Sequence, residues 1–186
     1  MKQQLLNMIL LALLFTITGC KQNRKNSLKT FNREVYIPEY AKGFKISGTE
    51  HTQSTLIEIF NPWQGAQDVA MTYFISRDNE QAPDGFTGQV IKAGAERIVC
   101  MSSSYIAMLD VIGEVDRVTG VSGIQYISNP YILAHKNTIP DMGAEMNYER
   151  LVTLKPDVVL LYGIGDAQTG ITEKLKELSI PYLYMG

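Results

Sequence analysis

Apolar residues occur along this chain in three patterns, and each pattern predicts a different part of the molecule. Residues 5–17 form an almost unbroken apolar run behind the positive start Met1-Lys2. Residues 44–77 contain short β-branched and aromatic runs separated by turn residues, which is typical of antiparallel strands. From Glu96 onward, short apolar runs alternate with segments of helical periodicity. That alternation predicts a parallel sheet with helices packed on it.

The first folded part is expected to be a small addition of antiparallel β-structure. Residues 56–60 and 70–75 are its clearest strands, and Asn61-Pro62 breaks the pattern between them. Residues 78–89 are polar and rich in turn formers, so they predict a loop. We assign residues 41–95 to this β elaboration.

The second folded part is expected to be an α/β domain with a parallel, Rossmann-like sheet, over residues 96–186. Its strands are predicted at residues 97–101, 117–121, 157–162 and 181–184, and its helices at 105–112, after Asn147 and at 171–178. Asn147 is a favourable N-cap, and Pro156 disfavours helical geometry at Lys155, so that helix ends there. Residues 157–162 are apolar in succession, as expected when both faces of a sheet are covered.

Charge and cysteine content narrow the function. The 186 residues carry 17 Lys and Arg against 19 Asp and Glu, with no basic patch, so nucleic acid is not an expected partner. Cys100 lies in an apolar run and is interpreted as a small buried hydrophobe. His51 and His135 have no second ligand at metal-binding spacing, so neither a metal site nor an intrinsic cofactor is expected. Asp141 is interpreted as a surface or turn charge.

The end of the N-terminal apolar run, Ile17-Thr18-Gly19-Cys20, resembles a bacterial lipobox. This resemblance implies a lipoprotein signal peptide at residues 1–19, cleavage before Cys20, and lipid on the Cys20 sulfur and amine. Several acyl chains on one residue give stable membrane anchoring. Residues 20–40 are then a tether outside the cytoplasm. The alternatives are an ordinary secretory peptide or an uncleaved anchor in which Cys20 is incidental.

Ligands of parallel α/β domains bind beyond the carboxyl ends of the strands. The residues expected there are Ser102, Ser103, Ser104, Tyr105, Ser122, Gly123, Ile124, Gln125, Tyr126, Gly163 and Gly165. Hydroxyls, glycines, an amide and tyrosines suit recognition of a bulky, partly polar ligand, and no paired acid and base accompanies them, so the protein is not expected to be an enzyme.

Two other functions stay open on the residues alone. One is an anchored hydrolase that uses a serine of residues 102–104, although no Gly-x-Ser-x-Gly pattern surrounds them. The other is a structural surface lipoprotein. A dinucleotide-binding loop at Gly163 is disfavoured, because Gln168 stands where the third glycine would be.

Two segments, residues 97–122 and 147–159, resemble the substrate-binding proteins of ABC importers for iron-siderophores, haem and vitamin B12. The resemblance implies that residues 96–186 are the N-terminal lobe of a two-lobed protein whose second lobe is absent, so the chain is expected to be a fragment. It also implies a monomeric, membrane-anchored receptor that delivers a metal chelate to an ABC permease. An iron-siderophore is the expected ligand, with haem or a corrinoid as alternatives.

The same resemblance assigns Glu149 to docking on permease arginines. A second interpretation also holds, because a carboxylate in a first helical turn is stabilised by the helix dipole. Glu149 is expected on the outer face of the lobe, away from the strand-end loops. Tyr126 is expected to supply an aromatic platform for the ligand.

Overall fold

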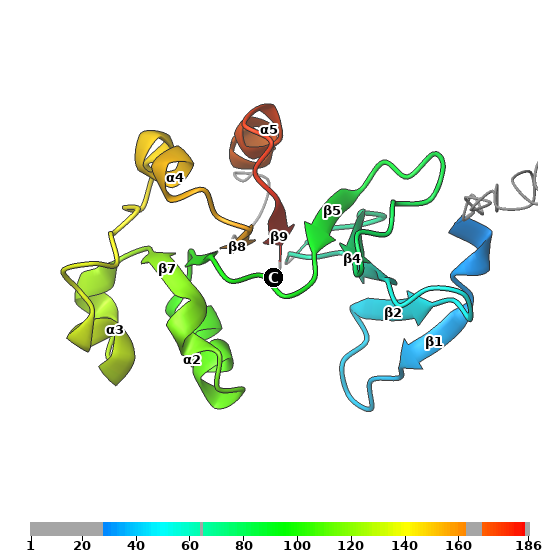
Figure 1. Ribbon diagram of the computed structural model, residues 1–186, viewed down its shortest axis with the longest axis horizontal. Coiled ribbons are helices and arrows are strands. Elements are labelled where there is room, and N and C mark those ends of the chain that lie inside the picture. Colours follow the sequence, from blue (N-terminus) through cyan, green and yellow to red (C-terminus); the bar gives the residue numbers. More distant parts are fainter. Residues whose placement is uncertain (1–27, 64, 163–168, 185–186) are drawn as a thin grey trace, which may run out of the picture.

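The computed structural model describes residues 28–63, 65–162 and 169–184. Within them lie two β-sheets, one of five strands and one of four. Figure 1 shows the α-helices gathered around the four-stranded sheet, with β5 of the other sheet beside β9. No helix in these ranges is both long enough and apolar enough to cross a membrane.

The five-stranded sheet has the strand order β1-β2-β3-β4-β5. Its strands are β1 (Arg33–Tyr36), β2 (Phe44–Gly48), β3 (Thr55–Phe60), β4 (Ala70–Ser76) and β5 (Gln89–Lys92). Neighbours are antiparallel from β1 to β4, whereas β5 runs parallel to β4. The antiparallel strands predicted at 56–60 and 70–75 are therefore confirmed.

The expected tether boundary at residue 40 is wrong, because β1 lies inside residues 20–40. Its four residues are all exposed, and backbone pairing with β2 holds the strand, with Arg33 opposite Gly48. Just before it, a 3-10 turn at Leu28–Thr30 leads to Phe31, which is buried and packs edge-on against Phe74. Regular structure is therefore already present at residue 28, the first residue that the structure describes.

The four-stranded sheet is parallel, with the strand order β7-β6-β8-β9. Its strands are β6 (Ile98–Cys100), β7 (Val118–Val121), β8 (Val158–Leu161) and β9 (Tyr182–Tyr184). The helices are α2 (Ser103–Val111), α3 (Pro130–Ala134), α4 (Tyr148–Leu154) and α5 (Thr169–Glu177). The predicted α/β fold with a parallel sheet is confirmed, whereas α3 was not expected.

Local chemistry sets the limits of α4 as the sequence predicted. The Asn147 side chain accepts a hydrogen bond from the Arg150 N–H at 2.9 Å and so caps the first turn. At the other end, Lys155 adopts a left-handed conformation with φ of 48°, immediately before Pro156. This helix therefore begins and ends at positions that its own sequence specifies.

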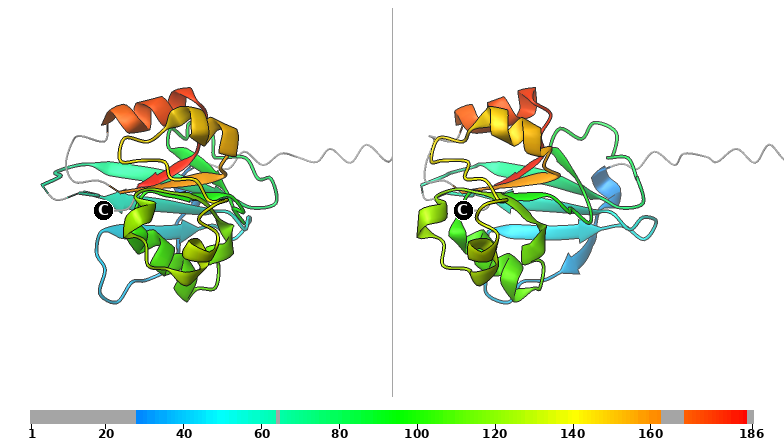
Figure 2. Two further views of the ribbon diagram at one scale, coloured as in Figure 1. Left: turned by 90° about the vertical axis from the view of Figure 1, so that its left-hand side faces the viewer. Right: turned by 60° about the vertical axis from the view of Figure 1, so that its left-hand side comes forward.

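Both faces of the parallel sheet are covered, as Figure 2 shows: α4 and α5 lie on one face, α2 and α3 on the other. The α4–α5 side buries Val99, Leu151, Val159 and Leu175. The α2–α3 side buries Cys100, Ile106, Val121 and Ile132 together with Tyr73 of β4. Because Tyr73 belongs to the same apolar cluster as the α2–α3 side, the two sheets share one core.

Candidate ligand-binding edge

The carboxyl ends of three parallel strands meet at one edge of the sheet. The Met101 N–H donates to the Leu160 carbonyl at 3.0 Å, and the Ser122 N–H donates to the Cys100 carbonyl at 3.1 Å. The segments that follow β6, β7 and β8 therefore start side by side. This is the arrangement in which open α/β sheets bind ligands.

Solvent reaches the predicted residues of this edge to different extents. Ser103, Ser104 and Gln125 are exposed, while Ser102, Ser122, Gly123 and Ile124 are half-buried. Tyr126 is 83% exposed, so most of its ring is available for contact with a ligand. Gly163 and Gly165 lie outside the described residues.

Two of the predicted residues have structural roles in α2. Tyr105 is only 4% exposed, and its hydroxyl donates to the Leu161 carbonyl at 2.9 Å. Burial raises the pKa of Tyr105 to about 12. Its assignment to the ligand-contacting set is therefore wrong, because its helical position directs the ring into the core. Ser102 is the N-cap of α2, and its hydroxyl oxygen accepts from the Ser104 N–H at 3.3 Å.

Asp141 shapes the loop after β7, which sequence reasoning did not recognise. Its carboxylate accepts hydrogen bonds from the N–H groups of Gly123 and Ile124, each at 3.0 Å, and of Gly143 at 2.8 Å. These bonds and the nearby Arg150 hold the pKa of Asp141 below its usual range, against the opposing effect of desolvation. The carboxylate thereby fixes the backbone that leads into Tyr126.

Glu149 lies exposed in the first turn of α4, as expected. The guanidinium of its neighbour Arg150 donates from Nη1 to the Asp141 carbonyl at 2.6 Å. Asp141 in turn holds the loop after β7. The start of α4 is therefore connected through Arg150 and Asp141 to the loop after β7, while the separation of Glu149 from the ligand residues stays a prediction.

An aromatic pair stands at the end of β9. The rings of Trp63 and Tyr184 meet edge to face, with centroids 5.7 Å apart and an interplanar angle of 74°. Trp63 is half-buried, whereas Tyr184 is fully buried. Within the described residues the Tyr184 hydroxyl has no hydrogen-bond partner. At the end of neighbouring β8, Tyr162 is 49% exposed.

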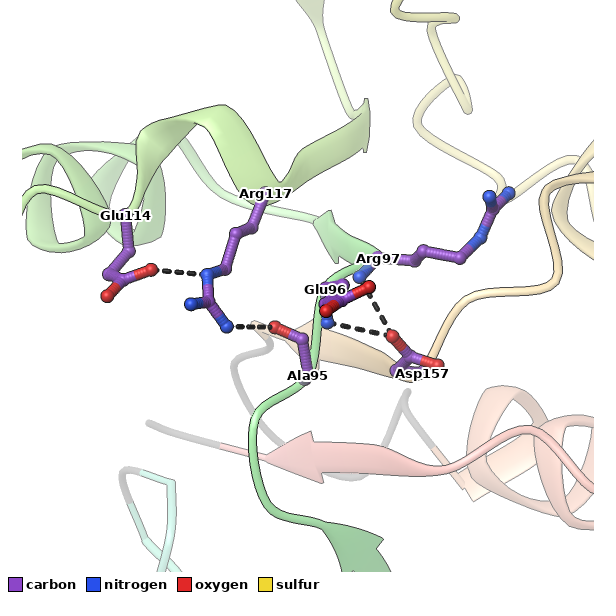
Figure 3. A network of polar contacts seen from close by, with 6 residues as sticks. All are labelled: Ala95, Glu96, Arg97, Glu114, Arg117 and Asp157. Atoms are coloured by element: carbon purple, nitrogen blue, oxygen red, sulfur yellow. Dashed lines mark hydrogen bonds and ion pairs between the residues drawn. The ribbon is translucent and has the colours of Figure 1, made fainter.

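A polar network at the amino edge of the sheet has a structural role (Figure 3). The Asp157 carboxylate accepts from the N–H groups of Glu96 at 2.8 Å and Arg97 at 2.9 Å. Arg117 pairs with Glu114 and donates to the Ala95 carbonyl. These bonds fix the chain where it enters β6 and β8, at the opposite edge from the candidate site.

Cysteine and histidine side chains do not form a reactive site in the described part. Cys100 is fully buried, and burial raises its thiol pKa to about 12, which confirms the interpretation as a buried hydrophobe. His135 ends α3, where its ring stacks on Tyr131. No three His, Cys, Asp or Glu side chains of the described residues are grouped so that they could hold a metal ion.

Comparison with known proteins finds a family match within the α/β part. Residues 98–186 match the family model described as periplasmic binding protein, so the resemblance drawn from the sequence is confirmed over this segment. An uncharacterized lipoprotein of Methanocaldococcus jannaschii is 22% identical over 191 residues, covering 95% of this chain and 48% of the relative. The chain thus spans about half the length of that relative.

Solved structures also align with part of the chain. A petrobactin-binding protein from Bacillus subtilis is 19% identical with a TM-score of 0.44, covering 54% of this chain and 34% of that one. A periplasmic solute binding protein from Veillonella parvula is 24% identical with a TM-score of 0.42, covering 50% and 30%. A vitamin B12 binding protein from Vibrio cholerae is 23% identical with a TM-score of 0.40, covering 48% and 33%.

Proposed function

We propose that this protein is an extracytoplasmic receptor that binds a metal chelate and delivers it to an ABC importer. The observation that carries the proposal is the match of residues 98–186 to the periplasmic binding protein family. The strand-end segments that gather at one edge of its sheet support a binding role. We further propose that a second lobe closes over this edge, so that one lobe alone binds weakly.

The ligand that we propose is an iron-siderophore, with haem and a corrinoid as competing chelates. The exposed ring of Tyr126 offers apolar contact to the organic body of such a ligand. The hydroxyls of Ser103 and Ser104, both exposed at the start of α2, offer hydrogen bonds to its polar groups. The Ser102 hydroxyl caps α2, which is a structural role. This role agrees with a binding protein and gives no support to the use of Ser102 as the nucleophile of a hydrolase.

A membrane anchor at Cys20 is the second part of the proposal. Its support is the lipobox-like end of the N-terminal apolar run, and the relative from Methanocaldococcus jannaschii is itself named a lipoprotein. Replacing Cys20→Ser should abolish labelling with radioactive palmitate and release the protein from membranes. Labelling that persists in the variant would remove the anchor from the proposal.

Ligand binding and permease docking should respond to different substitutions. Tyr126→Ala should weaken chelate binding in calorimetric titrations while docking survives. Glu149→Ala should leave chelate affinity nearly unchanged but reduce uptake into vesicles that contain the permease. Tyr40→Ala is a matched control, since Tyr40 is also exposed but lies on the five-stranded sheet's β1–β2 connection. A wild-type protein that binds no chelate would overturn the proposed function.

A further inference from the structure

Trp63 lies outside the segment that matches the family model, yet it reaches the end of the parallel sheet. It belongs to the loop between β3 and β4 of the antiparallel sheet. Its contact with Tyr184 places that loop at the carboxyl end of β9, the same end at which the strand-end segments gather. Figure 2 shows the β3–β4 connection projecting on the side of the molecule toward which β9 points.

We propose that Trp63 is a side wall of the ligand site and gives it a preference for chelates that carry aromatic rings. The inference rests on the proposed function and adds a residue from the N-terminal sheet to the site. In this arrangement the antiparallel sheet is part of the receptor's specificity, rather than a separate attachment to the binding lobe.

The loop that carries Trp63 is closed at its base, so the ring is held in place before any ligand arrives. The Asn61 N–H donates to the Val69 carbonyl at 2.8 Å, and the Val69 N–H donates to Asn61 Oδ1 at 3.1 Å. Between them, Pro62 is buried. A preorganised aromatic side chain loses little conformational entropy on binding, which favours its use as a contact surface.

The chemistry around Trp63 suits an aromatic ligand with polar substituents. One part of the indole packs against the cluster that contains Tyr184, and within the described part of the chain Tyr184 is the aromatic ring that it meets. Tyr162 adds a second half-exposed ring at the adjoining strand end. The buried Tyr184 hydroxyl, which lacks a partner in the described ranges, offers a hydrogen bond to an oxygen of a ligand that enters beside Trp63.

The test compares three probes on the protein as expressed from its gene: ferric enterobactin and haem, which are aromatic, and ferrioxamine B, which is aliphatic. Trp63→Ala should weaken binding of an aromatic probe about three- to tenfold, the effect of losing one aromatic pair, and change ferrioxamine B binding less than about twofold. Trp63→Phe should retain most of the affinity. Val90→Ala, an exposed apolar change on β5, should leave all affinities unchanged.

Thermal unfolding by circular dichroism accompanies each titration. If Trp63→Ala is poorly folded, Trp63→Leu replaces it, because leucine keeps apolar bulk and removes only the aromatic face. If wild type and Trp63→Ala bind every probe with equal affinity, Trp63 is not a wall of the ligand site, and the proposed function is unaffected. Wild-type binding of ferrioxamine B alone would overturn the aromatic preference. A wild type that binds none of the probes would overturn the proposed function and the wall together.

Discussion

The Tyr73 hydroxyl accepts a hydrogen bond from the Tyr184 N–H at 3.0 Å and thereby joins the two sheets. Tyr184 ends β9, and its N–H points away from β8 toward the antiparallel sheet. Both residues are 1% exposed or less, so water cannot replace the bond. A strand edge that would otherwise present an unpaired donor is covered in this way by a side chain of β4.

Removing that hydroxyl should destabilise the whole domain. In Tyr73→Phe the buried Tyr184 N–H loses its acceptor, which costs about 1–3 kcal/mol of the free energy of unfolding. Tyr36→Phe is the control, because Tyr36 is 55% exposed and keeps its ring stacked on Phe44. Urea denaturation followed by circular dichroism measures both. Equal stability of the two variants would show that the bond does not hold the sheets together.

Alkaline pH should destabilise the fold through groups that are buried in their neutral forms. Burial raises the pKa of Tyr73 and of Tyr105 from 10.0 to about 12, and that of Cys100 from 9.0 to about 12. The unfolded chain therefore releases these protons at lower pH than the folded chain. Stability should be intact below about pH 9 and should fall progressively between pH 9 and 12.

Urea midpoints at pH 7, 9 and 10.5 measure this dependence. Tyr73→Phe removes one of the titrating groups, so its loss of stability from pH 9 to 10.5 should be smaller than that of the wild type. Native Cys100 should also resist iodoacetamide at pH 8, as peptide mapping can show, and react once urea unfolds the chain. An unchanged slope in Tyr73→Phe would exclude Tyr73 as a contributor.

The elements that were predicted from sequence carry their determinants locally. The four residues of β8 are apolar in succession and all buried. Asn147 caps α4, the helix that begins at the next residue. β1 was missed because none of its residues is buried, so its sequence has no apolar face to reveal it. That strand exists through backbone pairing with β2, which only the tertiary structure supplies.

The candidate site was predicted in outline because part of it also has local determinants in the sequence. Strand ends are recognisable in the sequence, so the loop with Tyr126 was found. Trp63, which we propose as a wall of the site, was missed because it belongs to the loop between β3 and β4 of the other sheet, far away in the chain. Asp141 did have a local signal: Gly143 follows two positions later, the spacing of an Asx-turn, and the Gly143 N–H does bond to the Asp141 carboxylate.

Two glycines of the α/β part should respond to alanine in opposite directions. A Cβ added at Gly120 of β7 would lie 3.0 Å from Leu154 Cδ1 and 3.2 Å from Val99 Cγ2, so Gly120→Ala should cost about 1–3 kcal/mol by overpacking. At Gly170 of α5 a Cβ meets nothing within 4 Å. Gly170→Ala should therefore stabilise the helix, by less than the roughly 0.5–1 kcal/mol of a mid-helix position, because Gly170 is the second residue of α5. Thermal unfolding of both variants gives the sign of each change in stability. Unchanged stability of Gly120→Ala would contradict the close packing of α4 on β7.

The carboxylate of Asp141 should control both the ligand loop and the start of α4. Asp141→Asn keeps one acceptor oxygen but places an amide donor where the second carboxylate oxygen accepted, so at least one bond to the loop is lost. We expect chelate affinity to fall and the peptide bonds of residues 122–126 to become sensitive to protease at neutral pH. Asp110→Asn is the control, because it makes the same chemical change at an exposed position of α2 and should leave both readouts unchanged.

The pH dependence of stability distinguishes the effect of the Asp141 charge from the effect of the shape of its side chain. Because its folded-state pKa is lowered, the stability that it contributes is present above the ordinary pKa of 3.8 and is lost as the pH falls through the folded-state value. The difference between wild type and Asp141→Asn should therefore be full at pH 7 and should shrink when both are unfolded by urea near pH 3. A difference that stays constant over this range would mean that the carboxylate's charge does not hold the loop, and that side-chain shape alone accounts for its effect.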